Sequence, residues 1–250
     1  MTGPTPTPRV LYVHDDLSEE LSTRAGAPRA AELGRALLAL LGADPRRVVI
    51  LTLAQQLDAV IARGDRIPFV LTVGIGAAGA RVAGQLNRRT GWFPRIRQVE
   101  VWREEDDLGG YALAGPAALG AQLADLPDAP SVAVVDDTIF SGLTMQGVLG
   151  ALPPALRPRA HAFCLRAVAG SLGEVARLAP VTAGFAAEGR LLEDVSFINA
   201  SGLVRRGAIR RVGRPRLAFF ERPEWIEAWF PRCHREVIAL CRELNAQLEP

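Results

Sequence analysis

The sequence contains no lysine, because all 29 members of its Lys+Arg count are arginines. This absence excludes a lysine Schiff base to pyridoxal phosphate or to a sugar carbonyl, and it excludes a P-loop that ends in Lys-Ser/Thr. It also excludes the strand lysine of protein kinases. An anionic ligand would have to be bound by arginine, by backbone N–H groups, by a helix N-terminus or by a metal ion.

Cysteine and long apolar runs are also scarce. Cys164, Cys233 and Cys241 have no metal-binding spacing and cannot all pair, which favours a reduced, cytoplasmic setting. No uncharged apolar run approaches the ~18–20 residues that span a membrane. Residues 1–8 lack the basic and apolar regions of a signal peptide, so we expect a short disordered tail there.

The rest of the composition is typical of a globular chain with one or two domains, since 49% of its 250 residues are hydrophobic. Short apolar stretches alternate with stretches of helical spacing. Strands are predicted near residues 9–14, 47–53, 68–73, 131–135, 159–168 and 181–186, and helices between them include residues 30–41 and 54–63. Such alternation indicates a parallel sheet covered on both faces. The predicted fold class is α/β, with a doubly wound, mainly parallel sheet.

Two segments depart from this alternation. Residues 97–102 alternate like an exposed strand, residues 104–110 form a polar turn, and residues 111–114 are expected to return antiparallel. Residues 188–250 hold an Arg-rich segment and then a helix that begins near Pro223 and is interrupted by Pro231. We therefore predict an α/β core over residues 9–187 that carries a flap at about 97–114, followed by a C-terminal hood over residues 188–250.

The most informative segment is SVAVVDDTIFSGLTM, residues 131–145. It predicts a buried strand with Asp136 and Asp137 at its carboxyl end, where ligands bind in doubly wound sheets. The loop after it offers consecutive N–H groups at the start of a helix that begins near Leu143, which favours an anion. The segment predicts a monophosphate site beside two carboxylates; the alternative is an ordinary strand–turn–helix with an Asp-rich N-cap.

The sequence VVDDTIFSGLTM closely resembles the motif that binds 5-phosphoribosyl-1-pyrophosphate (PRPP) in type I phosphoribosyltransferases. The resemblance implies that Asp136 and Asp137 face the ribose 2- and 3-hydroxyls as catalytic carboxylates and contact Mg²⁺ indirectly. It also implies that the residues after them hold the 5-phosphate of PRPP. These are Thr138, Ile139, Phe140, Ser141, Gly142, Leu143 and Thr144.

An earlier glycine-rich segment, TVGIGAAG at Thr72–Gly79, stands where this family binds pyrophosphate. Its glycines also match the G-x-G-x-x-G fingerprint of dinucleotide binding, but no acidic strand end follows ~20 residues later. A plain strand-to-helix turn is the other alternative. The resemblance assigns pyrophosphate binding to Gly74, Ile75, Gly76, Ala77, Ala78 and Gly79.

The family also closes a mobile flap over the reacting sugar, and residues 97–114 occupy that place. Gly109 and Gly110 would form its hinge, and Arg103 is the nearest cation for the leaving pyrophosphate; a solvated hairpin is the alternative. Acceptor binding is expected within residues 188–206, at Phe197 and Asn199, although Phe197 is equally compatible with the core.

The resemblance therefore implies Mg²⁺-dependent transfer of the 5-phosphoribosyl group from PRPP to an acceptor, with release of pyrophosphate, and a homodimer is expected. Phe140 stands where enzymes that salvage 6-oxopurines carry an aspartate that exchanges a proton with the base, and their two loop lysines are missing here. Salvage of 6-oxopurines is therefore not expected. The acceptor stays open among nucleobases and other small amines or alcohols.

A non-catalytic protein that binds PRPP or a nucleotide for regulation is the second hypothesis. It is motivated by the lysine-free pyrophosphate segment and by six arginines between Arg205 and Arg216. Such a cluster could contact nucleic-acid phosphates, but the net charge of only +2 and the lack of interleaved aromatic residues argue against a nucleic-acid partner. No membrane partner is expected.

Overall fold

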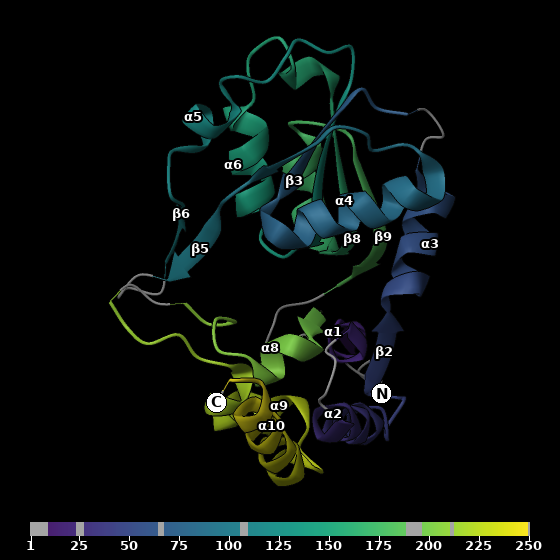
Figure 1. Cartoon of the computed structure of the whole chain (residues 1–250), viewed down its shortest axis with the longest axis vertical. Coiled ribbons are helices and arrows are strands. Elements are labelled where there is room, and N and C mark those ends of the chain that lie inside the picture. The colour runs from purple at the N-terminus through teal and green to yellow at the C-terminus, as the bar shows by residue number, and fades with distance from the viewer. Residues whose placement is uncertain are drawn as a thin grey trace, which may run out of the picture. The chain divides into compact units, whose positions relative to one another are not determined.

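A computed structural model of the chain describes residues 10–23, 28–64, 68–105, 110–188, 197–210 and 213–249. The chain divides into two compact units (Figure 1): residues 1–53 together with 189–250 form one, and residues 54–188 form the other. The second unit is therefore an insertion between the two parts of the first. The tail predicted at residues 1–8 lies outside the described residues.

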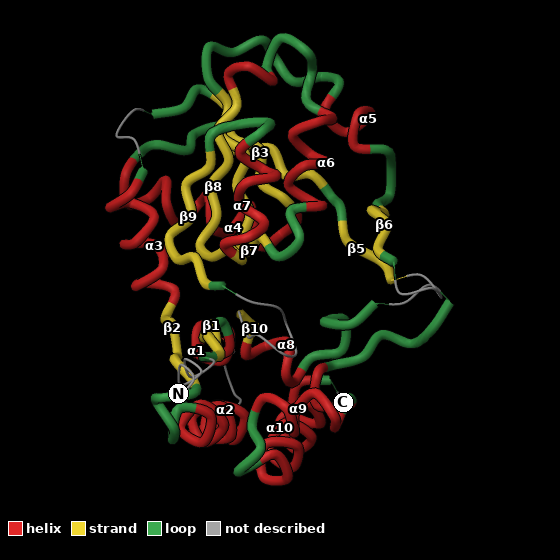
Figure 2. The backbone as a smooth tube through the Cα atoms, turned by 180° about the vertical axis from the view of Figure 1, so that it is seen from behind, coloured by secondary structure: helices red, strands yellow, loops and turns green. Residues whose placement is uncertain are grey.

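The inserted unit is built on a five-stranded sheet with the order β4-β3-β7-β8-β9, in which every pairing is parallel. Its strands are β3 (Leu71–Ile75), β4 (Ile96–Val99), β7 (Val132–Ile139), β8 (Ala160–Val168) and β9 (Val181–Ala187). Its helices are α3 (Leu53–Arg63), α4 (Gly76–Thr90), α5 (Leu119–Leu123), α6 (Leu143–Ala151), α7 (Ala169–Ala176) and the 3-10 helix η1 (Arg157–Arg159). The prediction of an α/β fold with a mainly parallel sheet is confirmed (Figure 2).

Strand β7 lies between β3 and β8, and it is enclosed on both faces. Its first four residues, Val132 to Val135, have no exposed surface. This enclosure is why the strand is a continuous apolar run rather than an alternating one. Side chains of β7 pack with those of α6, such as Met145 and Val148, in one hydrophobic cluster.

Helix α4 packs closely on this sheet because glycines stand at two of its contacts with the strands. A Cβ atom at Gly79 would lie 2.3 Å from the carbonyl oxygen of Val135, and one at Gly74 would lie 2.5 Å from Cα of Ala80. Gly76 differs, since a Cβ there would meet nothing within 4 Å, but its φ of +57° is one that glycine adopts readily. Gly74 and Gly79 therefore have a packing role.

The other unit contains a three-stranded parallel sheet with the order β10-β1-β2. Its strands are β1 (Leu11–Asp15), β2 (Val48–Thr52) and β10 (Phe197–Asn199). Its helices are α1 (Leu17–Thr23), α2 (Pro28–Leu41), α8 (Ala200–Val204), η2 (Phe219–Glu221), α9 (Pro223–Trp229) and α10 (His234–Leu248). Leu37, Trp229 and Leu244 belong to one buried cluster, so residues from both chain ends share a core.

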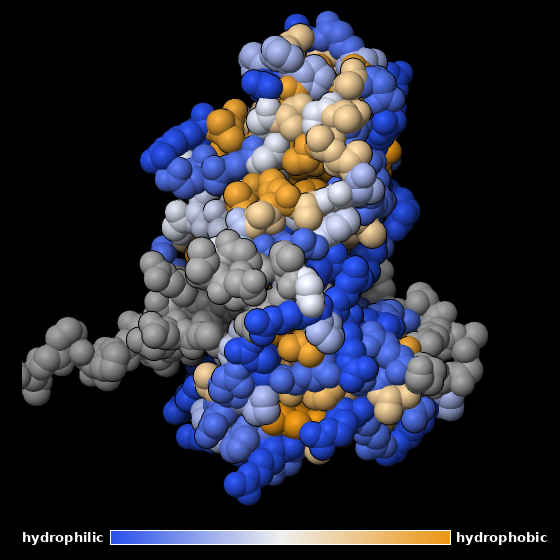
Figure 3. All heavy atoms as spheres, turned by 90° about the vertical axis from the view of Figure 1, so that its left-hand side faces the viewer, coloured by the Kyte–Doolittle hydropathy of each residue, from blue (hydrophilic) through white to orange (hydrophobic). Residues whose placement is uncertain are grey.

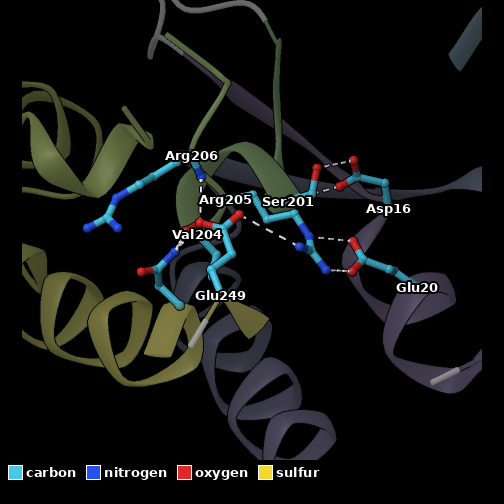
Figure 4. A network of polar contacts seen from close by, with 8 residues as sticks. Asp16, Glu20, Ser201, Val204, Arg205, Arg206 and Glu249 are labelled. Carbon is cyan, nitrogen blue, oxygen red and sulfur yellow. Dashed lines mark hydrogen bonds and ion pairs between the residues drawn. The ribbon is translucent and has the colours of Figure 1, made fainter. Parts of the chain in front are cut away.

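Polar contacts also join the two parts of this unit (Figure 4). One carboxylate oxygen of Asp16 accepts a hydrogen bond of 2.9 Å from the backbone N–H of Ser201, and the other accepts from the Ser201 hydroxyl. Arg205 forms an ion pair with Glu20, and its Nη1 lies 3.7 Å from Oε1 of Glu249. Segments about 185 residues apart in the sequence are thereby held together.

Two residues of the arginine-rich segment, Arg205 and Arg206, take part in such contacts. Arg206 pairs with Glu221 at 3.0 Å, and its backbone N–H donates to Glu249. The carboxylate of Glu221 also accepts from the backbone N–H of Ala218, and its pKa is lowered from its usual value because the contacts with Arg206 and Ala218 outweigh its partial burial. Arg205 and Arg206 therefore contribute to internal ion pairs, which weakens the case for a nucleic-acid surface.

Two predicted boundaries differ from the structure. The core predicted from residue 9 begins instead at residue 54, because β1 and β2 pair with β10 in the separate sheet. At the other end, the predicted boundary between residues 187 and 188 lies one residue before the division between residues 188 and 189. The flap predicted from residue 97 is shorter, because β4 pairs in parallel with β3 at the sheet edge. The antiparallel hairpin consists of β5 (Trp102–Glu105) and β6 (Tyr111–Ala114).

Exposed apolar side chains are few among the described residues. The large ones are Ile96, Tyr111 and Leu178. On the face drawn in Figure 3, apolar side chains gather over the upper part, and the lower part is mostly hydrophilic. Cys164, Cys233 and Cys241 are all free thiols. Within the described part of the chain, we find no helix with the length and apolar character to cross a membrane.

The packing of α4 predicts opposite effects for one substitution at two of its glycines. Gly79→Ala should destabilise the fold by about 1–3 kcal/mol, because the added methyl group overlaps the carbonyl of Val135. Gly84→Ala should be neutral or stabilise by up to about 1 kcal/mol, because the nearest atom is 3.8 Å away and alanine favours the helix. Urea unfolding of both variants measures this difference, and equal midpoints would contradict it.

Candidate functional site

Asp136 and Asp137 lie near the carboxyl end of β7, but the strand continues beyond them to Ile139. Thr138 and Ile139 pair with Arg166 and Ala167 of β8, so they belong to the sheet and not to the predicted loop. The side chain of Ile139 is buried in the core. The loop therefore consists of residues 140–142, and α6 begins at Leu143, where the sequence placed it.

The short loop turns sharply at Gly142, whose φ of +79° is left-handed. A Cβ atom there would lie 2.8 Å from Nε2 of Gln146, the end of a flexible side chain that can shift, so the backbone conformation is what favours glycine at this position. The hydroxyl of Ser171 in α7 donates to the carbonyl of Phe140, and the backbone N–H of Leu143 donates to the Ser141 hydroxyl at 3.4 Å. The first turn of α6 follows directly, and N–H groups of a first helical turn point toward a possible anion.

Asp136 is only 8% exposed, and its Oδ1 accepts a hydrogen bond of 2.8 Å from the backbone N–H of Asp137. Burial, together with the neighbouring carboxylate of Asp137, raises the pKa of Asp136 well above its usual value. The positive charge of Arg103 acts in the opposite direction. Burial therefore disfavours the ionised form of Asp136.

Asp137 is paired with a buried arginine. Its Oδ2 lies 2.8 Å from Nη2 of Arg166 and accepts a 3.2 Å hydrogen bond from the Thr138 hydroxyl. The Arg166 side chain has no exposed surface, whereas 19% of the Asp137 side chain remains exposed. Nη1 of Arg166 also donates to Oε1 of the buried Gln56 in α3, at 3.0 Å.

Sequence reasoning missed Arg166 and Gln56. The available signal was a single charged residue inside the otherwise apolar stretch AFCLRAV of β8, close to the carboxyl end of that strand. A charged side chain at a buried position requires a partner of opposite charge. Which carboxylate would pair with Arg166 depends on the alignment of β7 with β8, which is a tertiary property.

Arg103 of the hairpin lies beside the loop. Its guanidinium carbon is 5.8 Å from the ring centroid of Phe140 and 5.8 Å from that of Tyr111. Leu113 of β6 packs against α6, because a Cβ atom at Gly147 would lie 2.3 Å from its Cδ1. The hairpin therefore approaches the loop through an arginine and an apolar contact; Gly109 of the predicted hinge is outside the described residues.

In the predicted pyrophosphate segment, a helix follows a strand with no residue between them. Strand β3 ends at Ile75 and α4 begins at Gly76, so Ala77 and Ala78 lie in the first turn of the helix. Because β3 and β7 are neighbouring parallel strands, their carboxyl ends lie at the same edge of the sheet. The N–H groups of this turn lie at that edge, and their role in binding pyrophosphate stays a prediction.

The predicted acceptor residues belong to the other compact unit. Phe197 is buried in β10, and its ring centroid lies 5.1 Å from that of Tyr12. Asn199 ends β10 and aligns with His14 of β1. The packing of Phe197 supports its place in the core, and acceptor binding by either residue stays a prediction.

The carboxylates do not by themselves fit a magnesium ion held by the protein. One oxygen of Asp137 is engaged by Arg166, and burial disfavours the ionised form of Asp136. Among the residues that the structure describes, no group of three or more His, Cys, Asp or Glu side chains could hold a metal ion.

No protein-family model matches the sequence, and no curated protein matches it. Among solved structures, a purine phosphoribosyltransferase from Pyrococcus horikoshii Ot3 matches with a TM-score of 0.42 and 17% identity, over 60% of this chain and 91% of that chain. An orotate phosphoribosyltransferase from Aeropyrum pernix matches with a TM-score of 0.36 and 17% identity, over 53% and 70% of the two chains. Both matched structures are phosphoribosyltransferases.

A third match is a xanthine-guanine-hypoxanthine phosphoribosyltransferase from Helicobacter pylori, with a TM-score of 0.35 and 13% identity over 76% of this chain and 91% of that chain.

The raised pKa of Asp136 predicts that Asp136→Asn stabilises the fold at neutral and alkaline pH. Above the ordinary pKa of an aspartate, wild type must either bury a charge or retain a proton that the unfolded chain releases, so its stability falls as pH rises. Asparagine can keep the Oδ1 contact with the Asp137 N–H and does not titrate. The gain should be roughly a few degrees in Tm at pH 8, and it should shrink toward pH 4.

Thermal melts of both proteins from pH 4 to pH 8 measure this difference. Asp128→Asn is the matched control, because that exposed carboxylate pairs with Arg159 at the surface and should show no comparable gain. A difference between Asp136→Asn and wild type that is the same at every pH would contradict the assignment.

Proposed function

We propose that the protein is a phosphoribosyltransferase that transfers the 5-phosphoribosyl group of PRPP to an acceptor and releases pyrophosphate. The observation that carries this proposal is the arrangement at the end of β7. Two carboxyl groups, Asp136 and Asp137, precede a three-residue loop with a left-handed glycine and the first turn of α6. Monophosphate and ribose are the two parts of one ligand that fit these neighbouring features.

The 5-phosphate is assigned to the loop and helix start. The N–H groups of residues 141–144, together with the hydroxyls of Ser141 and Thr144, provide donors for its oxygens. Ser141 is exposed and Thr144 is half-buried. No cationic side chain belongs to this segment, and the helix dipole would supply the positive potential.

The ribose is assigned to the carboxyl groups. Asp137, which pairs with Arg166, would accept hydrogen bonds from ribose hydroxyls, and its carboxylate would stabilise positive charge that develops on the sugar as pyrophosphate departs. Asp136, whose pKa is raised by burial, would act mainly through hydrogen bonds. The work of these residues is positioning and electrostatic stabilisation, which suits a displacement at C1.

The leaving pyrophosphate would be bound without lysine. Arg103 is the cation next to the loop, and the first turn of α4, which begins at Gly76, offers backbone N–H groups at the same sheet edge. Mg²⁺ would arrive with PRPP, bound by the oxygens of the ligand, and would neutralise part of its charge. The proposal requires no metal cage built from protein side chains.

The acceptor is proposed to be a nucleobase or another small amine or alcohol. Phe140 occupies the centre of the loop, and its ring cannot exchange a proton with an acceptor. It is instead in contact range of the Arg103 guanidinium. An acceptor that needs an acid or base from this loop position is therefore disfavoured, which argues against 6-oxopurines.

Calorimetry with PRPP, with and without Mg²⁺, tests the binding part of this proposal. Wild type should bind PRPP, and Asp137→Asn should weaken binding about 10- to 100-fold, because it removes charge-assisted hydrogen bonds of about 1.5–3 kcal/mol. Asp58→Asn is the control, since that carboxylate is exposed on α3 and pairs with Arg89. Absence of PRPP binding by wild type would overturn the proposal.

Turnover separates an enzyme from a regulatory protein. Release of pyrophosphate would be measured with purines, pyrimidines and small amines or alcohols as acceptors. We expect release with at least one acceptor and none in the Asp136→Asn/Asp137→Asn double variant. PRPP binding without release for every acceptor would favour the regulatory alternative.

A further inference from the structure

Arg166 is a buried cation that lies outside the twelve-residue motif. It stands inside β8, and its side chain has no exposed surface. A charge removed from water in this way is tolerated only when opposite charge and hydrogen bonds compensate it. The carboxylate of Asp137 provides that charge from the neighbouring strand, at 2.8 Å.

Two partners define the orientation of the Arg166 guanidinium. Nη2 contacts Oδ2 of Asp137, and Nη1 donates to Oε1 of Gln56 at 3.0 Å. Gln56 is itself fully buried in α3. Because the guanidinium is planar and rigid, contacts at two of its nitrogens restrict both its position and its plane. A lysine ammonium has no such fork.

We infer that Arg166 is a positioning residue, which holds the Asp137 carboxylate in one orientation toward the ribose hydroxyls of PRPP. This inference rests on the proposed function. Arg166 acts through Asp137, and Gln56 acts through Arg166. The partly exposed Asp137 is thus the accessible end of a buried chain of contacts that begins on α3 and crosses β8 to β7.

The adjacency of two carboxyl groups makes this support necessary. Asp136 and Asp137 are consecutive, and like charges at such short distance repel one another in a poorly hydrated environment. The Arg166 guanidinium offsets this repulsion at Asp137 and restrains its side chain. The charge of Arg103, on the hairpin, also favours the ionised form of Asp136.

A double-mutant cycle on PRPP binding tests the inference. Arg166→Met should weaken PRPP binding about 10- to 100-fold, as loss of a supporting contact does in preorganised sites. In an Asp137→Asn background the same substitution should cost less than about threefold, because the residue through which Arg166 acts has already been changed. Arg166→Lys, whose single amine can still contact Asp137 but lacks the fork, should recover part of the affinity.

Two controls separate positioning from a general structural effect. Arg159→Met removes an exposed Arg–Asp pair in the same unit and should leave PRPP affinity unchanged. Inorganic phosphate, which has no hydroxyl-bearing sugar, should bind Arg166→Met as it binds wild type. A merely structural Arg166 would instead weaken the binding of both ligands.

The outcomes are distinguishable from those for the proposed function. Failure of wild type to bind PRPP overturns both. Three results would overturn the positioning role alone. The first is normal PRPP affinity in Arg166→Met, and the second is a loss of affinity that adds to that of Asp137→Asn. The third is a loss of phosphate affinity equal to the loss of PRPP affinity. If Arg166→Met does not fold, Gln56→Leu serves instead, because it keeps the ion pair with Asp137 and removes the hydrogen bond from Arg166 to Gln56. Gln56→Leu should weaken PRPP binding about threefold or more. It should have this effect only when Asp137 is present.

Discussion

Enclosure of β7 is the constraint on which the rest of the site depends. The strand lies between β3 and β8, and α4 approaches it so closely that Gly79 has no room for a side chain. Carboxyl groups at the end of such a strand are poorly hydrated, which raises the pKa of Asp136 and makes a cation necessary at Asp137. That cation, Arg166, is buried as well and requires a further polar partner on α3.

Much of this unit follows from local sequence pattern. The run SVAVV predicted a buried strand, the residues after it predicted a helix that begins at Leu143, and both features are present. The length of β7 was not predictable in the same way, because Thr138 and Ile139 become strand residues only through pairing with β8. The exposed strand predicted at residues 97–102 was assigned to the flap, but Ile96–Val99 pairs in parallel with β3 at the sheet edge, and local pattern does not indicate that pairing.

The composition of the other unit lay beyond sequence pattern for a physical reason. Strand β1 has the apolar character of any parallel strand, and nothing local indicates which sheet it joins. Its partner β10 is far away in the chain, with Tyr12 aligned to Phe197. The shared core of Leu37, Trp229 and Leu244 and the contact of Asp16 with Ser201 are likewise non-local. Long-range pairings of this kind carry no short-range signature, so the N-terminal strands were assigned to the wrong sheet.

At this site, arginine has chemical advantages over the lysine that the sequence lacks. A buried lysine tends to lose its proton, because burial disfavours the ammonium, whereas arginine remains charged. A guanidinium at Arg166 can therefore stay cationic with no exposed surface and still contact Asp137 and Gln56 together. Arg103 uses the other property of a guanidinium, which is its affinity for aromatic faces, here those of Phe140 and Tyr111. The two arginines thus have different roles. Arg166 provides a buried positive charge, and Arg103 provides a cation that lies beside the loop against aromatic rings.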